Sequence, residues 1–185
     1  MRLLERLFRR AGLPLSMTEG FHPKPRVSFP SALPLGVAGK EEVLEVELSA
    51  EMTPEELRET LDRHAPVGLK FGAIELLHEG AKKAALRRAT FEIPVPAHRQ
   101  AATQERVADL LSCESHHVDR GAGRTTVDLR RDLDDLRLEG GVLSMRLVFA
   151  REGTARPREV LEALALADLE QHGAHLSRTV VELTA

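Results

Sequence analysis

The alternation of apolar and polar positions in the first half of the chain predicts a helix, two strands, a second helix and a third strand. Apolar residues spaced by three and four predict the helices, and short or alternating apolar runs predict the strands. The first helix ends at Gly12 and Pro14, and the second begins with a capping box from Thr53 to Glu56. The expected helices cover residues 1–11 and 53–64, and the expected strands cover residues 26–29, 42–48 and 69–77.

The second half of the chain repeats this order and begins with an additional strand. Alternating apolar positions and glycine-rich turns predict the strands, while Pro157 marks the start of the last helix. The expected strands cover residues 89–95, 125–130, 142–149 and 175–183, and the expected helices begin near Thr103 and at Pro157. The resulting order, strand-helix-strand-strand-helix-strand, is that of a ferredoxin-like fold.

Corresponding positions recur in the two halves. The same spacing relates two sets of residues, Pro54, Leu57 and Leu61 in the first half and Pro157, Val160 and Leu164 in the second. We therefore expect an α+β protein of two ferredoxin-like (βαββαβ) halves in tandem, over residues 1–80 and 86–185, the first lacking its opening strand. That strand would be central in its sheet, so we expect either a start codon annotated too late or a strand supplied by another chain.

Composition narrows the classes of protein to which the chain can belong. With 42% hydrophobic and 30% charged residues it is globular, and charges interrupt every apolar stretch before the roughly 18–20 residues that a membrane span needs. We expect a cytoplasmic protein without a membrane partner, because the first residues contain no signal-peptide core. The one cysteine, Cys113, cannot form an internal disulfide or by itself hold an iron–sulfur cluster. Together with His116 and His117 it lacks a further zinc ligand, so we expect no metal and no cofactor.

Charge is distributed unevenly along the chain. Residues 1–40 carry seven Lys and Arg against two acids, whereas residues 41–79 carry three against eleven. A basic segment of this kind can bind a polyanion while acidic segments face solvent; the alternative is solvated surface of both signs. Trp and Tyr are absent, which disfavours RNA-binding modules that stack several bases on a sheet.

The proline-rich loop over residues 14–36 is the most unusual segment of the basic region. Residues that precede proline favour extended backbone, so Pro23 and Pro25 fix His22 and Lys24 in that form. In a β-like extension His22, Lys24 and Arg26 share one face, whereas a polyproline II twist would rotate them apart. A rigid cationic loop suits the capture of phosphate or carboxylate. The alternative is a stiff connection whose charges are merely solvated.

We expect the basic face of the first helix and this loop to converge into one anion- or partner-binding surface without catalytic residues. The residues expected to form it are Arg6, Arg9, Arg10, Glu19, Gly20, Phe21, His22, Pro23, Lys24, Pro25 and Arg26. Two weaker patterns remain. Residues 121–126 faintly resemble a phosphate-binding loop but fit a turn better, and Arg178 is expected to approach Asp128 and Arg130 in a structural ion pair.

Several motifs of the chain resemble the radical-SAM-linked domain of unknown function. They are Arg9-Arg10-Ala11-Gly12-Leu13-Pro14-Leu15, Glu19-Gly20-Phe21-His22-Pro23-Lys24-Pro25-Arg26-Val27-Ser28-Phe29, Ala32-Leu33-Pro34-Leu35-Gly36-Val37, Val127-Asp128-Leu129-Arg130, Arg156-Pro157-Arg158-Glu159-Val160-Leu161 and Ser177-Arg178-Thr179. That domain is fused to radical SAM proteins or encoded beside them. The resemblance implies an accessory, bacterial-type protein whose partner is a radical SAM protein, with RNA as a candidate substrate. It supplies no catalytic residues.

Three hypotheses about function follow. The first is a non-enzymatic module that presents RNA or another anionic substrate to a separate radical SAM enzyme, with arginines and Lys24 on phosphates. The second is a metal-independent RNA-processing enzyme with His22 as general base, for which no general acid is evident. The third is a purely protein-docking subunit.

Overall fold

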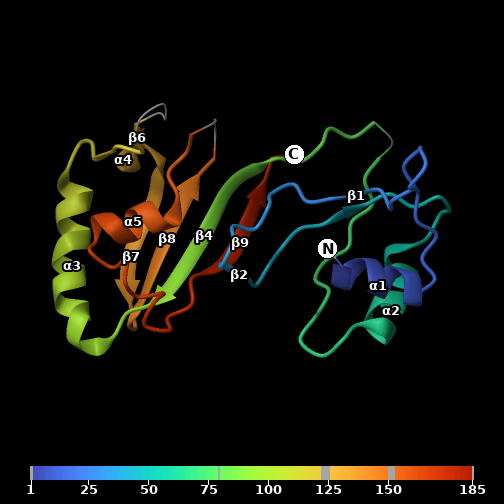
Figure 1. The fold of residues 1–185 in the computed structure, drawn as a ribbon, viewed down its shortest axis with the longest axis horizontal. Helices are drawn as coiled ribbons and strands as arrows, with labels where there is room; N and C mark the ends of the chain where they lie inside the picture. The colour runs from blue at the N-terminus through green and yellow to red at the C-terminus, as the bar shows by residue number, and fades with distance from the viewer. Residues whose placement is uncertain (1, 79, 122–125, 150–152, 185) are drawn as a thin grey trace. The chain divides into compact units, whose positions relative to one another are not determined.

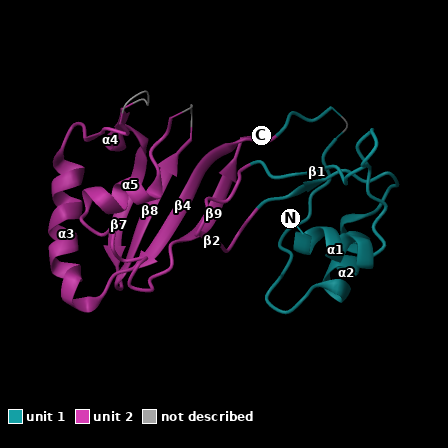
Figure 2. Cartoon of the chain, viewed as in Figure 1, with its two compact units in different colours: residues 1–30, 43–83 teal, residues 31–42, 84–185 magenta. Residues whose placement is uncertain are grey.

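The protein was analysed as a computed structural model that describes residues 2–78, 80–121, 126–149 and 153–184. The chain forms two compact units (Figure 2). Unit 1 comprises residues 1–30 and 43–83, and unit 2 comprises residues 31–42 and 84–185. Each unit has its own hydrophobic core, and each is described by itself below.

Unit 1 consists of two helices and a short antiparallel strand pair. Its elements are α1 (Arg2–Arg10), β1 (Val27–Ser28), β3 (Glu45–Val46) and α2 (Pro54–His64). The capping box predicted for α2 is present: the Thr53 side chain accepts a hydrogen bond from the Glu56 amide, and the Glu56 carboxylate accepts one from the Thr53 amide. This exchange satisfies two amides that the first turn of a helix leaves without partners.

The core of unit 1 is small. Leu7, Phe8 and Leu61 are its buried residues among those described, and partly buried residues from β1, β3 and residues 69–74 surround them. The strand predicted over residues 69–77 is absent, so that prediction was wrong. Its apolar side chains still pack on the core, but its backbone forms no ladder, and Arg58 donates to the carbonyls of Phe71 and Gly72 instead.

Unit 2 is built around a five-stranded sheet of mostly antiparallel strands (Figure 1). The strands of this sheet are β2 (Ala38–Gly39), β4 (Leu86–Pro94), β7 (Leu133–Glu139), β8 (Val142–Val148) and β9 (Ser177–Leu183), and the helices are α3 (Ala97–Ser112), α4 (Leu129–Asp132) and α5 (Pro157–Ala163). A separate pair joins β5 (His117–Val118) to β6 (Val127–Asp128). The order across the sheet is β2-β9-β4-β8-β7.

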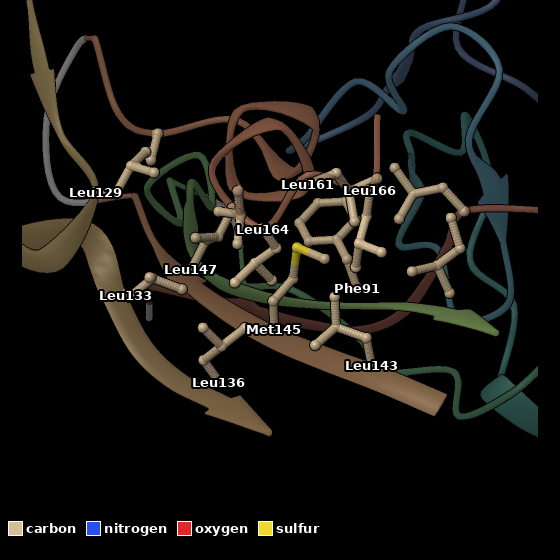
Figure 3. Packing of buried hydrophobic residues seen from close by; sticks show 14 of the residues in the cluster. Phe91, Leu129, Leu133, Leu136, Leu143, Met145, Leu147, Leu161, Leu164 and Leu166 are labelled. Atoms are coloured by element: carbon tan, nitrogen blue, oxygen red, sulfur yellow. The ribbon is translucent and has the colours of Figure 1, made fainter. Parts of the chain in front are cut away.

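The core of unit 2 lies between one face of this sheet and the helices α3 and α5. Alternate residues of β4 and β8 face it, so Phe91 lies opposite Met145 and Ile93 opposite Leu143 in the register. Figure 3 shows Met145 and Phe91 packed beneath Leu161, Leu164 and Leu166. Apolar and polar residues alternate along these strands because one face of the sheet is buried, as the sequence pattern indicated.

Segment 31–42 departs from the predicted division of the chain. We expected residues 1–80 to form the first half, but residues 31–42 belong to unit 2, where β2 pairs in parallel with β9. Ala38 donates its amide to Leu176, and Lys40 donates its amide to Arg178. Backbone hydrogen bonds and the buried side chain of Val37 attach the end of the proline-rich loop 14–36 to the larger unit.

The α+β class of the fold is confirmed, whereas two ferredoxin-like halves in tandem are not. In unit 2 the types of the long elements follow the predicted order, strand-helix-strand-strand-helix-strand, as β4-α3-β7-β8-α5-β9. The second of these strands, β7, covers residues that the sequence analysis assigned to no strand, in place of the strand predicted over residues 125–130. In unit 1 the described strands are two residues long and form a single pair. The strand predicted over residues 125–130 is limited to Val127–Asp128 in the described residues, because Asp128 caps the short helix α4.

Candidate functional site

Residues 16–26 of the proline-rich loop fold back on themselves as a hairpin. Met17 and Pro25 form an antiparallel bridge, and the Thr18 amide donates to the Lys24 carbonyl at 2.8 Å. The Lys24 amide in turn donates to the Thr18 hydroxyl at 3.0 Å. The residues at the tip, 19–23, lie beyond these bonds, and Gly20 has a φ of +118°, which glycine adopts without steric cost. We call residues 16–26 the basic hairpin.

The base of the basic hairpin is braced by Glu47, the residue that follows β3. The Arg26 amide donates to the Ser16 carbonyl at 2.8 Å, the Ser16 amide to the Glu47 carbonyl at 2.8 Å, and the Glu47 amide to the Arg26 carbonyl at 3.0 Å. The backbone segments at Ser16, Arg26 and Glu47 are thus each hydrogen-bonded to the other two. Next to it, Val27 of β1 lies opposite Val46 of β3 and packs against the unit 1 core. The hairpin therefore stands on a fixed base, which lowers the entropy that ligand binding would cost.

The predicted site residues of the hairpin are mostly exposed. Glu19, Gly20, His22, Pro23 and Lys24 face solvent, and Pro25 is half-buried in the bridge to Met17. The Phe21 ring is fully exposed at 102% of its reference area. No ion pair is described for Lys24 within the residues that the structure covers.

Arg26 has contacts that the sequence did not predict. Its guanidinium lies 3.4 Å from a carboxylate oxygen of Glu47, and its Nε donates to the Met17 carbonyl at 3.3 Å. Both side chains of this pair are about half exposed, and an exposed ion pair contributes only about 0–1 kcal/mol. An incoming phosphate would compete with Glu47 for Arg26, while Lys24 meets no such competitor among the described contacts.

The arginines of α1 form the other part of the predicted surface. Arg2, Arg6 and Arg9 are exposed, and none has an ion pair in the described part of the chain. Arg10 differs, because it donates to the carbonyl of His64 at the end of α2. No contact described within unit 1 joins an α1 guanidinium to the hairpin tip, and the loop that follows α1 extends away from this helix in Figure 1. Convergence of the two parts stays a prediction.

A second group of charged residues, in unit 2, was missed from the sequence. Arg178 is buried in β9, and its Nε donates to Glu42 at 2.9 Å while a second donor reaches the other carboxylate oxygen. Its remaining donors meet the Ser31 hydroxyl at 2.8 Å, the Ser31 carbonyl at 3.1 Å and the Ala32 carbonyl at 3.4 Å. A guanidinium has five N–H donors, so segment 31–42 uses all of them.

Arg120 and Glu159 form a further enclosed ion pair. Nε and Nη2 of Arg120 donate to the two carboxylate oxygens at 2.6 and 2.7 Å, and Arg120 also donates to the carbonyls of Gly153 and Thr154. Burial alone would raise the pKa of Glu159, but the hydrogen bonds from Arg120 and the Arg156 amide hold it below the ordinary value of 4.5. Both side chains are 10% exposed.

A cavity of about 330 Å³ lies between these two ion pairs. Arg120 and Arg178 line it together with Arg156, Phe91 and Phe149. The donors of Arg178 and most of those of Arg120 are already used by the protein, whereas the exposed Arg156 has no described ion pair. We therefore regard Arg178 and Arg120 as structural rather than as an anion site.

The ion pair predicted between Arg178 and the residues Asp128 and Arg130 was wrong. Asp128 accepts hydrogen bonds from the amides of His116 at 2.9 Å and Arg130 at 3.1 Å, and the His116 bond lowers the pKa of Asp128 most strongly. Arg130 donates to the Cys113 carbonyl. Arg178 pairs with Glu42 instead, a residue 136 positions away, so no local sequence signal could have found the pair.

The other sequence candidates add no site. No group of three or more His, Cys, Asp and Glu suited to a metal ion occurs among the described residues. The exposed Cys113 thiol donates to the Asp109 carbonyl. Within the weak phosphate-loop pattern over 121–126, residues 122–125 lie outside the described part of the chain.

Comparisons with known proteins identify a family but no activity. No described helix is both long and apolar enough to cross a membrane. Neither the curated proteins nor the solved structures contain a match to the chain. Residues 1–157 match the model of a family described as an uncharacterized protein conserved in bacteria (DUF2344). The match covers most of the chain, including the basic hairpin, and the chain therefore belongs to this bacterial family.

Proposed function

We propose that this protein is an accessory binding module that presents RNA or another anionic substrate to a separate radical SAM enzyme. The observation that carries the proposal is the basic hairpin: the side chains of Phe21, His22 and Lys24 are exposed at the end of a braced hairpin, and none of them makes a described contact that stabilises the fold. Arg2, Arg6 and Arg9 of α1, which have no ion pair among the described residues, add positive charge to the same unit. Such charges hold phosphates without reading sequence.

The radical SAM part of the proposal rests on the resemblance of the motifs. The motifs of unit 2 have structural explanations: Arg178 and Arg158 bind segment 31–42, and Arg158 donates to the Leu35 carbonyl at 3.0 Å. The motif around His22 has no such structural explanation beyond the formation of its own turn, which favours a role in binding a substrate or partner. Since Cys113 alone cannot supply a cluster with thiolates, the radical chemistry would belong to the partner.

The sheet of unit 2 is a poorer candidate for RNA binding than the hairpin. The face that points away from α3 and α5 carries a ring of ion pairs, in which Arg88 and Arg146 alternate with Asp134 and Glu182. Its five strands contain a single aromatic residue, Phe91, which is buried in the core. Proteins that read RNA on a sheet stack bases on exposed aromatic rings. The order of elements in unit 2 still supports a ferredoxin-like ancestry for that unit.

The proposal is tested by the salt dependence of RNA binding. The variant Lys24→Ala/Arg26→Ala should bind a structured RNA more weakly, and the slope of log affinity against log salt should fall by about one for each lost phosphate contact. Lys82→Ala/Lys83→Ala is the matched control, because it removes the same charge from exposed residues of the same unit. This control variant should bind the RNA with the affinity and the salt slope of the wild type.

Other results would distinguish the alternatives. Equal losses in the two variants would show a general charge effect and would contradict a site at the hairpin. Cleavage of the RNA that disappears in His22→Ala would favour the enzyme hypothesis. Absence of RNA binding, with capture of the radical SAM partner lost in the hairpin variant, would favour the protein-docking subunit.

A further inference from the structure

The exposure of Phe21 distinguishes it from the other phenylalanines. Phe8 and Phe91 are buried, Phe71 and Phe149 are partly buried, and Phe29 is 37% exposed, whereas Phe21 is fully exposed. In the folded chain this ring gains nothing from hydrophobic burial. It contributes nothing visible to the stability of unit 1, so its chemistry is available to a partner.

The hairpin holds this ring at a fixed height above its base. The bonds between Thr18 and Lys24 close the hairpin directly beneath the tip, and Pro23 restricts the backbone of the preceding residue, His22. The tip is therefore a short projection with an aromatic end, closed at its base. A ring on a closed hairpin loses less backbone entropy on stacking than a ring on a disordered segment.

The surroundings of Phe21 favour a nucleobase over a protein pocket. An aromatic anchor in a protein interface is normally surrounded by other groups that exclude water. The neighbours of Phe21 are instead Glu19, Gly20, His22, Pro23 and Lys24, all exposed, and of these Pro23 alone is apolar. A single flat ring beside an imidazole and an ammonium group matches one unpaired base and its phosphate, since every base has a π-face.

We infer that Phe21 stacks on an unpaired nucleobase of the RNA while Lys24 binds an adjacent phosphate, so that the substrate of this module is a single-stranded or looped region. This inference rests on the proposed function and narrows its substrate class. Because one ring reads no base edges, binding should show little sequence preference. Duplex RNA offers no free base face, so it should engage the cations but not the ring.

The absence of Trp and Tyr from the chain allows a direct test. Phe21→Trp places a single indole at the tip, and its fluorescence should be quenched when a stem-loop RNA binds but not when a fully paired duplex binds. Val67→Trp is the matched control, because Val67 is equally exposed in another loop of unit 1. Its fluorescence should remain unchanged with both RNAs.

Affinity measurements separate this inference from the proposed function. Phe21→Ala should weaken stem-loop binding about 5- to 150-fold, the range for loss of one base stack, and should leave both duplex binding and the salt slope unchanged. Stem-loop binding that depends on Lys24 but is the same in Phe21→Ala, without quenching at position 21, would overturn the inference and leave the proposed function intact. Failure of every variant and of the wild type to bind RNA would overturn both. Loss of the radical SAM partner in Phe21→Ala, with RNA binding unchanged, would assign the ring to a protein contact.

Discussion

Single charged side chains in this protein differ in whether the fold already uses their hydrogen-bonding groups. Arg178 and Arg120 are enclosed, and carboxylates and carbonyls within unit 2 accept their hydrogen bonds. A buried guanidinium without such acceptors would be strongly destabilising. Lys24 and His22 are exposed and make no comparable contacts. This contrast is why we propose the hairpin, rather than the enclosed arginines of unit 2, as the binding site.

The Arg120–Glu159 pair predicts how unit 2 responds to acid. The pKa of Glu159 is lowered in the folded state, so the unfolded state binds more protons as the pH falls below the ordinary value of 4.5. The stabilisation is complete above that pH and is lost as the pH falls through the lower folded-state pKa. Glu159→Gln should therefore be less stable than the wild type near neutral pH, by about 2–4 kcal/mol, and should lose less stability on acidification.

The measurement is urea unfolding followed by far-ultraviolet circular dichroism at several pH values. Glu162→Gln is the matched control, because Glu162 is exposed on the same helix, α5. It should retain the acid response of the wild type. A Glu159→Gln variant whose stability falls with pH as steeply as that of the wild type would contradict the assignment.

At the scale of secondary structure, segment 31–42 depends on side chains that are remote in sequence. β2 contributes only two residues to the sheet, so backbone pairing alone attaches it weakly. Arg178 binds Ser31 and Glu42 near the two ends of the segment, and Arg158 binds the Leu35 carbonyl between them. Gly36, with a φ of +80°, leaves room for Arg158, since a Cβ there would lie 3.0 Å from its Nη2.

We predict that Glu42→Gln lowers the free energy of unfolding of unit 2 by about 2–3 kcal/mol. The change leaves the buried Arg178 charge without its counterion, and the 25% exposure of the Glu42 side chain places the loss at the low end for enclosed pairs. Amide exchange of Ala38 and Lys40, which donate to the carbonyls of Leu176 and Arg178, should also accelerate. The control is Glu41→Gln, an exposed neighbour with the same loss of charge. Equal stabilities of the two variants would show that the ion pair does not hold the segment.

Most elements with a local signal were predicted well from the sequence, although β7 was missed and α3 begins at Ala97 rather than near Thr103. Elements that need a distant partner were not predicted. The capping box fixed the start of α2, and alternation located β4 and β8, because each pattern reports the burial of the element that carries it. Residues 69–77 have strand-like apolar spacing but no neighbouring strand to pair with. The attachment of residues 31–42 to unit 2 rests on Arg178, more than 130 residues further along the chain.

In the candidate site, too, local features could be predicted from the sequence and contacts with distant residues could not. The extended backbone around His22 and Lys24 was predictable, because proline acts on the residue before it. The pairing of Arg26 with Glu47 was not, since it requires β3 to lie beside the hairpin. The exposure of the Phe21 ring is likewise a property of the folded unit, and no pattern in the sequence indicates it.

At the scale of the whole molecule, the two units differ greatly in the apolar surface that they bury. Unit 1 has three buried hydrophobic residues among those described, Leu7, Phe8 and Leu61, whereas the core of unit 2 extends through its sheet and the helices α3 and α5. A small core supports little stability by itself. Opening of unit 1 should therefore require less free energy than opening of unit 2.

Hydrogen exchange followed by mass spectrometry tests this difference within one molecule. Amides of α2 should exchange faster than those of α3, β4 and β8, and Leu61→Ala should accelerate exchange in α1 and α2 while leaving β4 and β8 unchanged. Leu143→Ala is the matched control, because it removes the same side chain from the core of unit 2; each change should cost about 2–5 kcal/mol in its own unit.

Exchange that accelerates equally in both units for either variant would mean that the chain unfolds as one cooperative body. If the units respond separately, the basic hairpin stands on the less stable of the two, and a bound RNA should slow exchange in unit 1 first, because binding to the folded form adds to its stability.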